Sequence, residues 1–437
     1  MIIILGCGES GFGAALLAQA QGLKVFVSDG SKIRETFRKE LIEREIDFEE
    51  EGHSIIYDCH PELVIQSPGI PDVAEPIQFF KEKKIAIISE IEFAFRYCTG
   101  KIIAITGSNG KTTTTNLTHH ILVTAGLDAV KVGNVGVSFC RSLAAGAHQY
   151  YVVEVSSFQL DTTDRFQPDI AVILNITPDH LDRYGHDMGR YAAAKFRIAK
   201  NQHKENHLIL YRDAGIERYV PSMVLDGPQI HWVETTMDDS ENVSINGETR
   251  FQLQHARLKG RHNAMNLACA AAACSLLGIT DEIIQRAVDS FVNDAHRLEL
   301  IDVINGVQYV NDSKATNVDS VYWALDAMRT SIIWIAGGQD KGNDYTVIDP
   351  LVKTKVRALI ALGKDNSKLL QHYEGIVPVF DTHAMEDAVR IGRQQALEGD
   401  VVLLSPACAS FDLFSNYIHR GNEFRTAVMK LKTEYAA

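Results

Sequence analysis

Short apolar runs alternate with helical stretches along the chain, and this alternation constrains the fold more than any other feature. Runs such as IIIL at 2–5, KVFVSD at 24–29 and AVILNIT at 171–177 are bounded by turn residues. Strands separated by helices in this way predict parallel α/β sheets. Because 437 residues exceed what one hydrophobic core usually supports, we expect several such domains.

Composition excludes several classes of protein. Lys and Arg total 43 against 56 Asp and Glu, and the net charge of −13 argues against a general affinity for nucleic acid or anionic membranes. No apolar run reaches the roughly 18 residues that a membrane helix requires, and MIIILG lacks a basic leader and a cleavage site. The seven cysteines include no C-x-x-C pair, so neither a disulfide framework nor a zinc site is indicated. We expect a cytoplasmic monomer whose partners are small molecules.

The segment AITGSNGKTTTTNL is similar to a phosphate-binding loop with one departure. The usual motif is G-x-x-x-x-G-K-[ST], and Ile105 stands where its first glycine would be. An apolar strand precedes the loop and a Thr-rich helix follows, so backbone amides and the helix dipole would attract phosphate. Gly107 and Gly110 would let the backbone wrap the phosphates, Lys111 would reach the outer phosphates, and Thr112 would ligate magnesium. The alternative is a Gly-Lys turn that caps the helix.

Candidate metal ligands follow two further apolar runs. Glu154 ends YYVVE, and Asp179 and His180 follow AVILNIT, so all three are expected at the carboxyl edge of a sheet, where doubly wound folds bind ligands. Glu154 could instead pair with a basic neighbour, and His180 could be an ordinary loop histidine. Lys195 lies in the helical segment YAAAKFRIAK, where a solvated surface lysine is the ordinary interpretation.

Polar clusters near both ends of the chain suggest further ligand sites. GCGESG fits G-x-G-x-x-G directly after IIIL, and Asp29 ends the next strand, which is typical of a dinucleotide-binding turn; a tightly packed turn without a ligand is the alternative. In the last third of the chain, Arg297, Lys314 and Lys341 lie in loops after strands. Fixed cations of this kind predict a phosphate or carboxylate site, although each alone could form a surface ion pair.

These features predict three domains. We expect an N-terminal Rossmann-like domain over residues 1–96, a central P-loop-type ATPase α/β domain over 97–295, and a C-terminal Rossmann-like α/β domain over 296–437. Within the central domain, Asn246-Gly247 predicts a β-hairpin, and residues 263–277, followed by Gly278, predict a helix.

The motifs TGSNGKTTTTNL, NITPDHLDRY, AAAKFRI, GRHNAMN, HRLE, NDSKATN, GGQDKG and LLSPACASFDLF together resemble those of the Mur ligases of bacterial cell-wall synthesis. The resemblance extends over the whole chain. That family, with the related folylpolyglutamate synthases, typically carries T-G-x-N-G-K-T, so Ile105 fits the family form of the loop. The resemblance implies an ATP-dependent ligase of peptidoglycan synthesis that uses two magnesium ions and an acyl-phosphate intermediate. SPGI, DSKATN and SPACAS resemble the members that join D-glutamate to UDP-N-acetylmuramoyl-L-alanine.

The resemblance also implies roles for individual residues. Lys195 matches a lysine that is carbamylated in the family, which would turn a cation into a metal-binding anion. The catalytic and metal-binding residues would be Lys111, Thr112, Glu154, His180 and carbamylated Lys195. The residues that contact ATP would be Gly107, Ser108, Asn109, Gly110, Lys111, Thr112, Thr113, Asn263, Arg297 and Asp312. The uridine nucleotide and muramoyl group would lie against Gly8, Glu9, Ser10, Asp29, Ser67, Pro68, Gly69, Asn134, Ser156 and Gln159. D-Glutamate would bind Thr316, Lys341, Ser410 and Phe411, near Tyr417, which stands where relatives have Phe.

Two other classes of function stay open on the sequence alone. A nicotinamide oxidoreductase would use GCGESG and Asp29 but would leave the central loop unexplained. A non-catalytic nucleotide switch would use that loop but would need no anion site in the last third of the chain. Among ligases, the nearest alternative is a sister Mur ligase or a folylpolyglutamate-synthase-like enzyme that adds a different amino acid.

Overall fold

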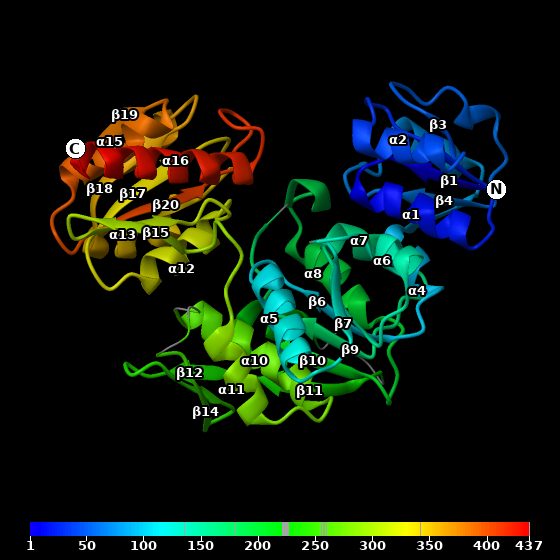
Figure 1. Ribbon diagram of the computed structural model, residues 1–437, viewed down its shortest axis with the longest axis horizontal. Helices are drawn as coiled ribbons and strands as arrows, with labels where there is room; N and C mark the ends of the chain where they lie inside the picture. Colours follow the sequence, from blue (N-terminus) through cyan, green and yellow to red (C-terminus); the bar gives the residue numbers. More distant parts are fainter. Residues whose placement is uncertain are drawn as a thin grey trace. The chain divides into compact units, whose positions relative to one another are not determined.

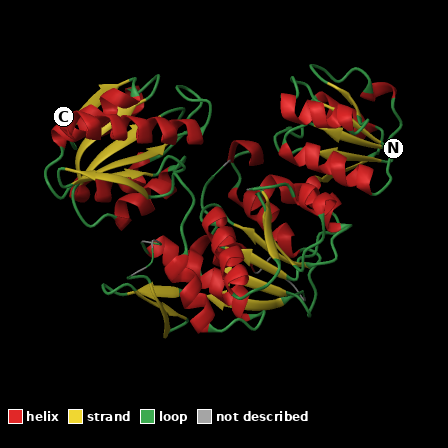
Figure 2. Cartoon of the chain, viewed as in Figure 1, coloured by secondary structure: helices red, strands yellow, loops and turns green. Residues whose placement is uncertain are grey.

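The computed structural model describes residues 1–436 apart from 135, 180, 221–226, 255, 257, 259 and 341. Residue contacts divide the chain into two compact units, one of residues 1–256 with 264–291 and one of residues 257–263 with 292–437. Helices separate most of the strands in both units, so the predicted α/β class is confirmed (Figure 2). The division into three domains at residues 96 and 295 stays a prediction. In the described part of the chain, no helix combines the length and apolarity that a bilayer crossing requires.

The first sheet of the larger unit is parallel, with the strand order β3-β2-β1-β4-β5 (Figure 1). Successive residues of β1 point to opposite faces of the sheet. Ile4 belongs to the core cluster that includes Phe12 of α1, whereas Ile3 belongs to the cluster that includes Phe80 of α3. The elements are β1 (Ile2–Leu5), α1 (Glu9–Ala20), β2 (Val25–Ser28), α2 (Glu35–Glu43), β3 (Asp47–Glu49), β4 (Leu63–Gln66), α3 (Glu75–Glu82), β5 (Ala86–Ser89) and α4 (Glu90–Phe95).

The second sheet of this unit is also parallel, with the order β11-β10-β9-β6-β8-β7. Its elements are β6 (Lys101–Thr106), α5 (Lys111–Thr124), β7 (Ala129–Gly133), α6 (Phe139–Ala145), β8 (Tyr150–Glu154), α7 (Ser157–Asp161), β9 (Ile170–Ile173), α8 (Met188–Phe196), β10 (His207–Tyr211), α9 (Ala214–Tyr219), β11 (Gln229–Val233), α10 (Arg261–Ser275) and α11 (Asp281–Ser290). Strand β6 lies between β9 and β8, where the strand order reverses. Ligands bind at such switch points, and the phosphate-loop segment follows β6.

A small antiparallel sheet, β12-β13-β14, completes the unit with β12 (Thr235–Met237), β13 (Asn242–Ile245) and β14 (Glu248–Gln252). Asn246 and Gly247 join β13 to β14 with φ of 51° and 87°, so the predicted hairpin is confirmed. Helix α10 begins two residues before the predicted start and ends two residues before the predicted end. Gly278, three residues further on, has a φ of 81°.

The sheet of the smaller unit has the order β15-β16-β20-β17-β18-β19, with β15 antiparallel and the other strands parallel. The apolar runs SIIWIAGG, ALIALG, VPVF and VVLLSPA predict four strands, which are confirmed as β17 to β20, but the edge hairpin of β15 and β16 was not predicted. Trp334 of β17 packs in the cluster with α12 to α14, whereas Ile335 packs with α15 and α16. The elements are β15 (Glu299–Ile304), β16 (Val307–Asn311), α12 (Val318–Ala327), β17 (Ile332–Gly337), α13 (Asp349–Lys355), β18 (Val356–Leu362), α14 (Ser367–Tyr373), β19 (Val379–Thr382), α15 (Met385–Gln395), β20 (Val401–Ala407) and α16 (Tyr417–Ala436).

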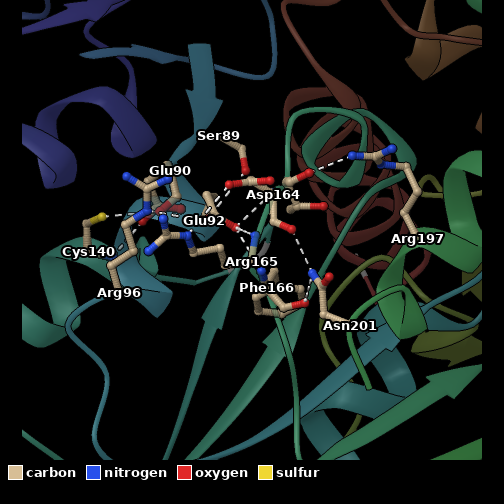
Figure 3. A network of polar contacts seen from close by, with 11 residues as sticks. Ser89, Glu90, Glu92, Arg96, Cys140, Asp164, Arg165, Phe166, Arg197 and Asn201 are labelled. Atoms are coloured by element: carbon tan, nitrogen blue, oxygen red, sulfur yellow. Dashed lines mark hydrogen bonds and ion pairs between the residues drawn. The ribbon is translucent and has the colours of Figure 1, made fainter. Parts of the chain in front are cut away.

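Two buried glutamates of α4 connect the first sheet of the larger unit to the second (Figure 3). Glu92 accepts the backbone N–H groups of Asp164, Arg165 and Phe166 at 2.9–3.0 Å and also pairs with Arg96. Glu90 accepts the N–H of Cys140 in α6 at 2.5 Å, and its second oxygen has no hydrogen-bond partner within the described residues. Burial raises the pKa of Glu90 to about 7.

Candidate active site

The phosphate-loop segment lies between β6 and α5 at the carboxyl edge of the second sheet. Ile105 belongs to β6, is fully buried, and accepts the N–H of Val155, so it is a strand residue and not part of the loop. The turn itself begins at Gly107. Gly110 adopts a φ of 83°, and a β-carbon there would stand 2.3 Å from Asn266 Oδ1. Glycine is therefore required at this position.

The segment that follows β9 holds the loop in a curled form. Asn175 accepts the N–H of Asn109 on its side chain at 2.8 Å and the N–H of Ser108 on its carbonyl at 3.1 Å. Its side-chain amide returns a bond to the Asn109 carbonyl. Ser108 Oγ donates to the Thr177 carbonyl at 2.8 Å. The segment after β9 thus fixes the loop by several hydrogen bonds, which favours a preformed anion site.

Two lysines meet at the carbonyl groups of this loop. Lys111 Nζ donates to the carbonyls of Gly107 and Ser108, each at 2.8 Å. Lys195 Nζ, from α8, donates to the same Gly107 carbonyl at 2.8 Å. Two ammonium groups this close would repel each other, which disfavours the protonated form of the buried Lys195.

Lys195 is not a surface lysine. Its side chain is only 1% exposed and its Nζ lies 4.5 Å from the centre of the Tyr191 ring. Burial lowers the pKa of Lys195 well below its usual range, and the charge of Lys111 lowers it further. The structure therefore places an amine with a strongly reduced proton affinity beside the phosphate loop.

Glu154 places a carboxylate with one oxygen that accepts no hydrogen bond from described residues at the carboxyl edge of the second sheet. It ends β8, is 1% exposed, and accepts the Asn134 side-chain amide on Oε1 at 2.8 Å. No described residue donates a hydrogen bond to Oε2. A buried carboxylate oxygen without a protein donor suits a divalent cation, and magnesium prefers oxygen ligands. Glu154 therefore fits a magnesium ion.

The other predicted metal ligands give less structural support for a metal site than Glu154 does. His180 lies outside the described residues, and Thr112 is buried at the start of α5. Within the described part of the chain, no group of three or more His, Cys, Asp and Glu side chains is placed to hold a metal ion. Carbamylation of Lys195 would add a further anionic oxygen ligand, and this modification stays a prediction.

The first sheet carries a second candidate site at its own carboxyl edge. A cavity of about 620 Å³ is lined by the glycine-rich turn at 6–10, by residues 29–31 and 67–71, and by His53, Ala74 and Pro76. Seven of the ten residues predicted to bind the uridine nucleotide and muramoyl group line it together, namely Gly8, Glu9, Ser10, Asp29, Ser67, Pro68 and Gly69. The glycine-rich motif with Asp29, and the family resemblance for residues 67–69, thus identified residues that share one cavity.

Asp29 organises this cavity. Its Oδ2 accepts the N–H of Cys7 at 2.6 Å and its Oδ1 accepts the N–H of Ser31 at 2.8 Å. These bonds join the turn after β1 to the turn after β2. Gly11 is needed for close packing, because a β-carbon there would lie 1.8 Å from the Gly6 carbonyl oxygen.

The remaining three residues of that predicted group lie at the second sheet. Ser156 and Gln159 form a reciprocal capping box at the start of α7, and Asn134 contacts Glu154 as described above. These residues follow β7 and β8, beside the phosphate loop and outside the cavity of the first sheet. Their contact with a muramoyl group stays a prediction.

The three ATP contacts predicted outside the loop lie in the smaller unit. Burial raises the pKa of Asp312 to about 7, and Asp312 accepts hydrogen bonds from Ser405 Oγ at 2.9 Å and Leu298 N–H at 3.2 Å. The Nε of Arg297 has no hydrogen-bond partner within the described residues. Asn263 is buried near the start of α10.

The predicted amino-acid site is only partly described. Ser410 is buried after β20, whereas Phe411 is 69% exposed. Thr316 is half-buried, and Lys341 lies outside the described residues. Lys314 Nζ lies 5.3 Å from the centre of the Tyr417 ring, so Tyr417 contacts one cation of this region.

Two residues that lie beside these sites were not predicted from the sequence. Arg183 donates to the Pro68 carbonyl at 3.1 Å and stacks over Phe158 at 4.0 Å, which links the segment after β9 to the rim of the first cavity. His53 lines that cavity from the segment after β3. Arg183 belongs to the quoted motif NITPDHLDRY, but His53 lies in no motif.

Three family domains match the chain in order. Residues 1–75 match the MurD N-terminal domain, residues 105–274 the Mur ligase middle domain, and residues 296–408 the Mur ligase glutamate ligase domain. The chain belongs to the Mur ligase family.

Two bacterial relatives of similar sequence carry the same name. The chain is 46% identical to the UDP-N-acetylmuramoylalanine--D-glutamate ligase of Porphyromonas gingivalis over 446 residues, covering 98% of both chains. It is also 46% identical to the protein of the same name from Cytophaga hutchinsonii over 444 residues, covering 98% of this chain and 99% of the relative.

Solved structures of lower identity share the fold. The UDP-N-acetylmuramate-alanine ligase MurC of Thermotoga maritima has a TM-score of 0.64 at 18% identity and covers 99% of both chains. The MurF ligase of the same organism, solved in complex with ADP, has a TM-score of 0.62 at 14% identity and covers 95% of this chain and 99% of its own.

Proposed function

We propose that this chain joins D-glutamate to UDP-N-acetylmuramoyl-L-alanine in peptidoglycan synthesis, with ATP as the energy source. The observation that carries the proposal is the nearly full-length, 46% identity to ligases of that name. The preformed phosphate loop, with Lys111 and Lys195 at its carbonyls and Glu154 at the same sheet edge, supports it independently.

The chemistry explains why a phosphate loop is needed. A carboxylate is a poor acyl donor, so one of its oxygens must first become a leaving group. The L-alanyl carboxylate attacks the γ-phosphorus of ATP and expels ADP, which gives an acyl phosphate. The amine of D-glutamate then attacks the carbonyl carbon, and the tetrahedral intermediate loses phosphate and a proton to give the amide.

The residues of the loop offset the repulsion between these anions. Lys111 leaves the loop carbonyls and pairs with the outer phosphates of ATP, while the loop amides and the start of α5 bind the phosphate oxygens. Two magnesium ions, held by Thr112, Glu154, His180 and carbamylated Lys195, would stabilise charge on the transferring phosphoryl group.

The environment of Lys195 favours the modification that this role requires. An uncharged amine attacks CO₂, forms an N–C bond and releases one proton, so a carbamate is left. The protonated amine has no electron pair for this attack. Because burial lowers the pKa of Lys195, more of the amine is uncharged near neutral pH than in an exposed lysine.

The remaining assignments belong to the same proposal. The cavity of the first sheet holds the uridine nucleotide, Asn263, Arg297 and Asp312 contact ATP, and Thr316, Lys341, Ser410 and Phe411 surround D-glutamate. The enzyme acts in the cytoplasm as a monomer. The nearest competing proposal within the family is a ligase that adds a different amino acid.

Phosphate release tests the reaction and the amino acid together. The purified chain is incubated with ATP, magnesium and UDP-N-acetylmuramoyl-L-alanine, and D-glutamate, L-glutamate, L-lysine or meso-diaminopimelate is added in separate reactions. We expect release with D-glutamate alone, matched by the amide product in a mass spectrum. Release with another of these amino acids would keep the ligase chemistry and overturn the substrate, and release with none would overturn the proposal.

A further inference from the structure

A chain of hydrogen bonds behind the first cavity ends at His53. Glu49, at the end of β3, accepts the hydroxyl of Ser28 at 2.9 Å and the N–H groups of Ile55 and Ile56 at 2.9 and 3.3 Å. Ser28 Oγ also lies 2.7 Å from His53 Nδ1. Ser28 is fully buried and Glu49 is 9% exposed, so this chain of bonds is shielded from water.

The proton order along this chain determines the state of the imidazole. Ser28 has one hydroxyl proton, and it donates that proton to Glu49 Oε1. His53 Nδ1 must then donate its hydrogen to Ser28 Oγ. In the neutral ring the other nitrogen, Nε2, is therefore a bare acceptor.

The ring of His53 lies at the wall of the cavity. His53 and Gly30 both line it, and a β-carbon on Gly30 would stand 3.0 Å from Nε2. Within the described residues, Nε2 has no hydrogen-bond partner. In a turn of this kind the phosphates lie at the start of the first helix and the ribose at the acidic residue after β2, here Asp29. His53 lies against Gly30, the residue that directly follows Asp29.

We infer that His53 is a specificity-determining residue that accepts a hydrogen bond from a ring N–H of the nucleobase and so selects uracil over cytosine. Uracil carries a hydrogen on N3, whereas N3 of cytosine is an acceptor and would face another acceptor at Nε2. Ser28 and Glu49 are positioning residues that hold the ring in this tautomer. The inference rests on the proposed function, because it deepens the assignment of the uridine nucleotide to this cavity.

Binding of free nucleotides tests this role without requiring ligase activity. Dissociation constants for UDP, CDP and 2′-deoxy-UDP are measured by calorimetry on the full chain, for the wild type and for His53→Phe. Loss of one hydrogen bond predicts that His53→Phe binds UDP about tenfold more weakly and CDP no more weakly than the wild type, so the preference for UDP over CDP falls at least about tenfold. His60→Phe, at an exposed histidine outside the cavity, should behave like the wild type.

Two further variants test the hydrogen-bond chain itself. Ser28→Ala frees Nδ1 and should reduce the UDP preference, whereas Ser28→Thr keeps the hydroxyl and should restore it. A His53→Phe variant that keeps the wild-type ratio of UDP to CDP affinity would overturn the inference. A changed ratio of UDP to 2′-deoxy-UDP affinity with an unchanged UDP to CDP ratio would assign His53 to the sugar and also overturn it. If the wild type shows ligase turnover, the proposed function stands whatever the result for His53. If the wild type binds neither UDP nor CDP and releases no phosphate, the proposed function and the role of His53 are both overturned.

Discussion

The two glycine-rich turns of the larger unit look alike in sequence but differ in their surroundings. Each follows the first strand of a parallel sheet and leads into a helix. The turn at residues 6–10 lines a cavity of about 620 Å³. The carboxylate of Asp29 joins this turn to the turn after β2 by accepting backbone hydrogen bonds from both. The backbone carbonyls of the turn at residues 107–110 accept hydrogen bonds from the amino groups of Lys111 and Lys195.

This difference shows that glycine spacing predicts a close approach to the backbone but not the chemistry that follows. Neutral donors and the carboxylates of Glu9 and Asp29 suit a ligand that is bound and not cleaved at its phosphates. The Lys111 cation, the Lys195 amine and a carboxylate oxygen of Glu154 without a protein donor suit phosphoryl transfer. We therefore expect substitutions at the two turns to affect different steps of the reaction.

The largest effect is expected at Lys195. Lys195→Ala removes the amine that would carry the carbamate, so turnover should fall by roughly 10³-fold or more, whereas the loop itself remains and ADP affinity should change by less than about threefold. Steady-state phosphate release and ADP calorimetry measure the two quantities. Lys200→Ala, at an exposed lysine that follows the same helix, is the matched control. Near-normal turnover of Lys195→Ala would refute the role.

Substitution of Lys111 should affect nucleotide binding as well as turnover. Lys111→Ala removes a charge-assisted hydrogen bond to phosphate, which predicts a loss of ADP affinity of roughly 10- to 100-fold. Lys101→Ala, at the exposed start of β6, should bind ADP like the wild type. If Lys111→Ala bound ADP as tightly as the wild type, the charge of Lys111 would not contribute to phosphate binding, and the proposed difference between the two turns would be wrong.

A smaller and more selective effect is expected at the first turn. Asp29→Asn replaces one acceptor of a backbone N–H by a donor, so KM for the muramoyl nucleotide should rise about tenfold while KM for ATP and kcat stay within about twofold. Initial rates with each substrate varied in turn separate these constants, and exposed Asp47→Asn provides the control. An equal rise in KM for ATP would show that the two turns do not act separately.

The junction between the two sheets of this unit gives a pH-dependent effect on stability. Because the folded-state pKa of Glu90 is about 7 and its ordinary value is 4.5, the folded state keeps a proton that the unfolded state loses between these pH values. The stability of the wild type therefore falls as pH rises from about 4.5 to 7, and Glu90 contributes about 3 kcal/mol to this fall. Glu90→Gln cannot ionise, so its unfolding free energy in urea should rise relative to the wild type from pH 5 to pH 8. Glu43→Gln, at an exposed glutamate, should show no such change in unfolding free energy. If the unfolding free energies of Glu90→Gln and the wild type differed by the same amount at pH 5 and pH 8, the proposed ionisation of Glu90 would be contradicted.

The sequence predicted the parts of the fold that depend on local pattern. Buried strands such as β6 and β17 were recognised because their apolar runs are uninterrupted. The edge strand β15 was missed because its half-exposed residues carry no apolar run, although Asn305-Gly306 gives the same turn signal as the hairpin that was predicted. Edge strands are stabilised by their neighbours, and a local pattern does not report those neighbours.

The candidate sites were predictable to a similar degree. Glycines and charged residues in known motifs identified most residues of both turns. The burial of Lys195 could not be derived from its helix, where spacing alone suggested a surface lysine, because burial depends on the packing of α8 against a distant loop. His53 was missed for a related reason, since its role follows from two buried side chains on other strands.

The most direct test of the difference between the two turns is a titration with both nucleotides. The wild-type chain is titrated with ADP and magnesium, with UDP, and with each nucleotide in the presence of saturating amounts of the other. Two separate sites predict one ADP and one UDP per chain, with each dissociation constant changed by less than a few-fold by the other nucleotide. Mutually exclusive binding would contradict the assignment, because it would mean that both nucleotides occupy one turn.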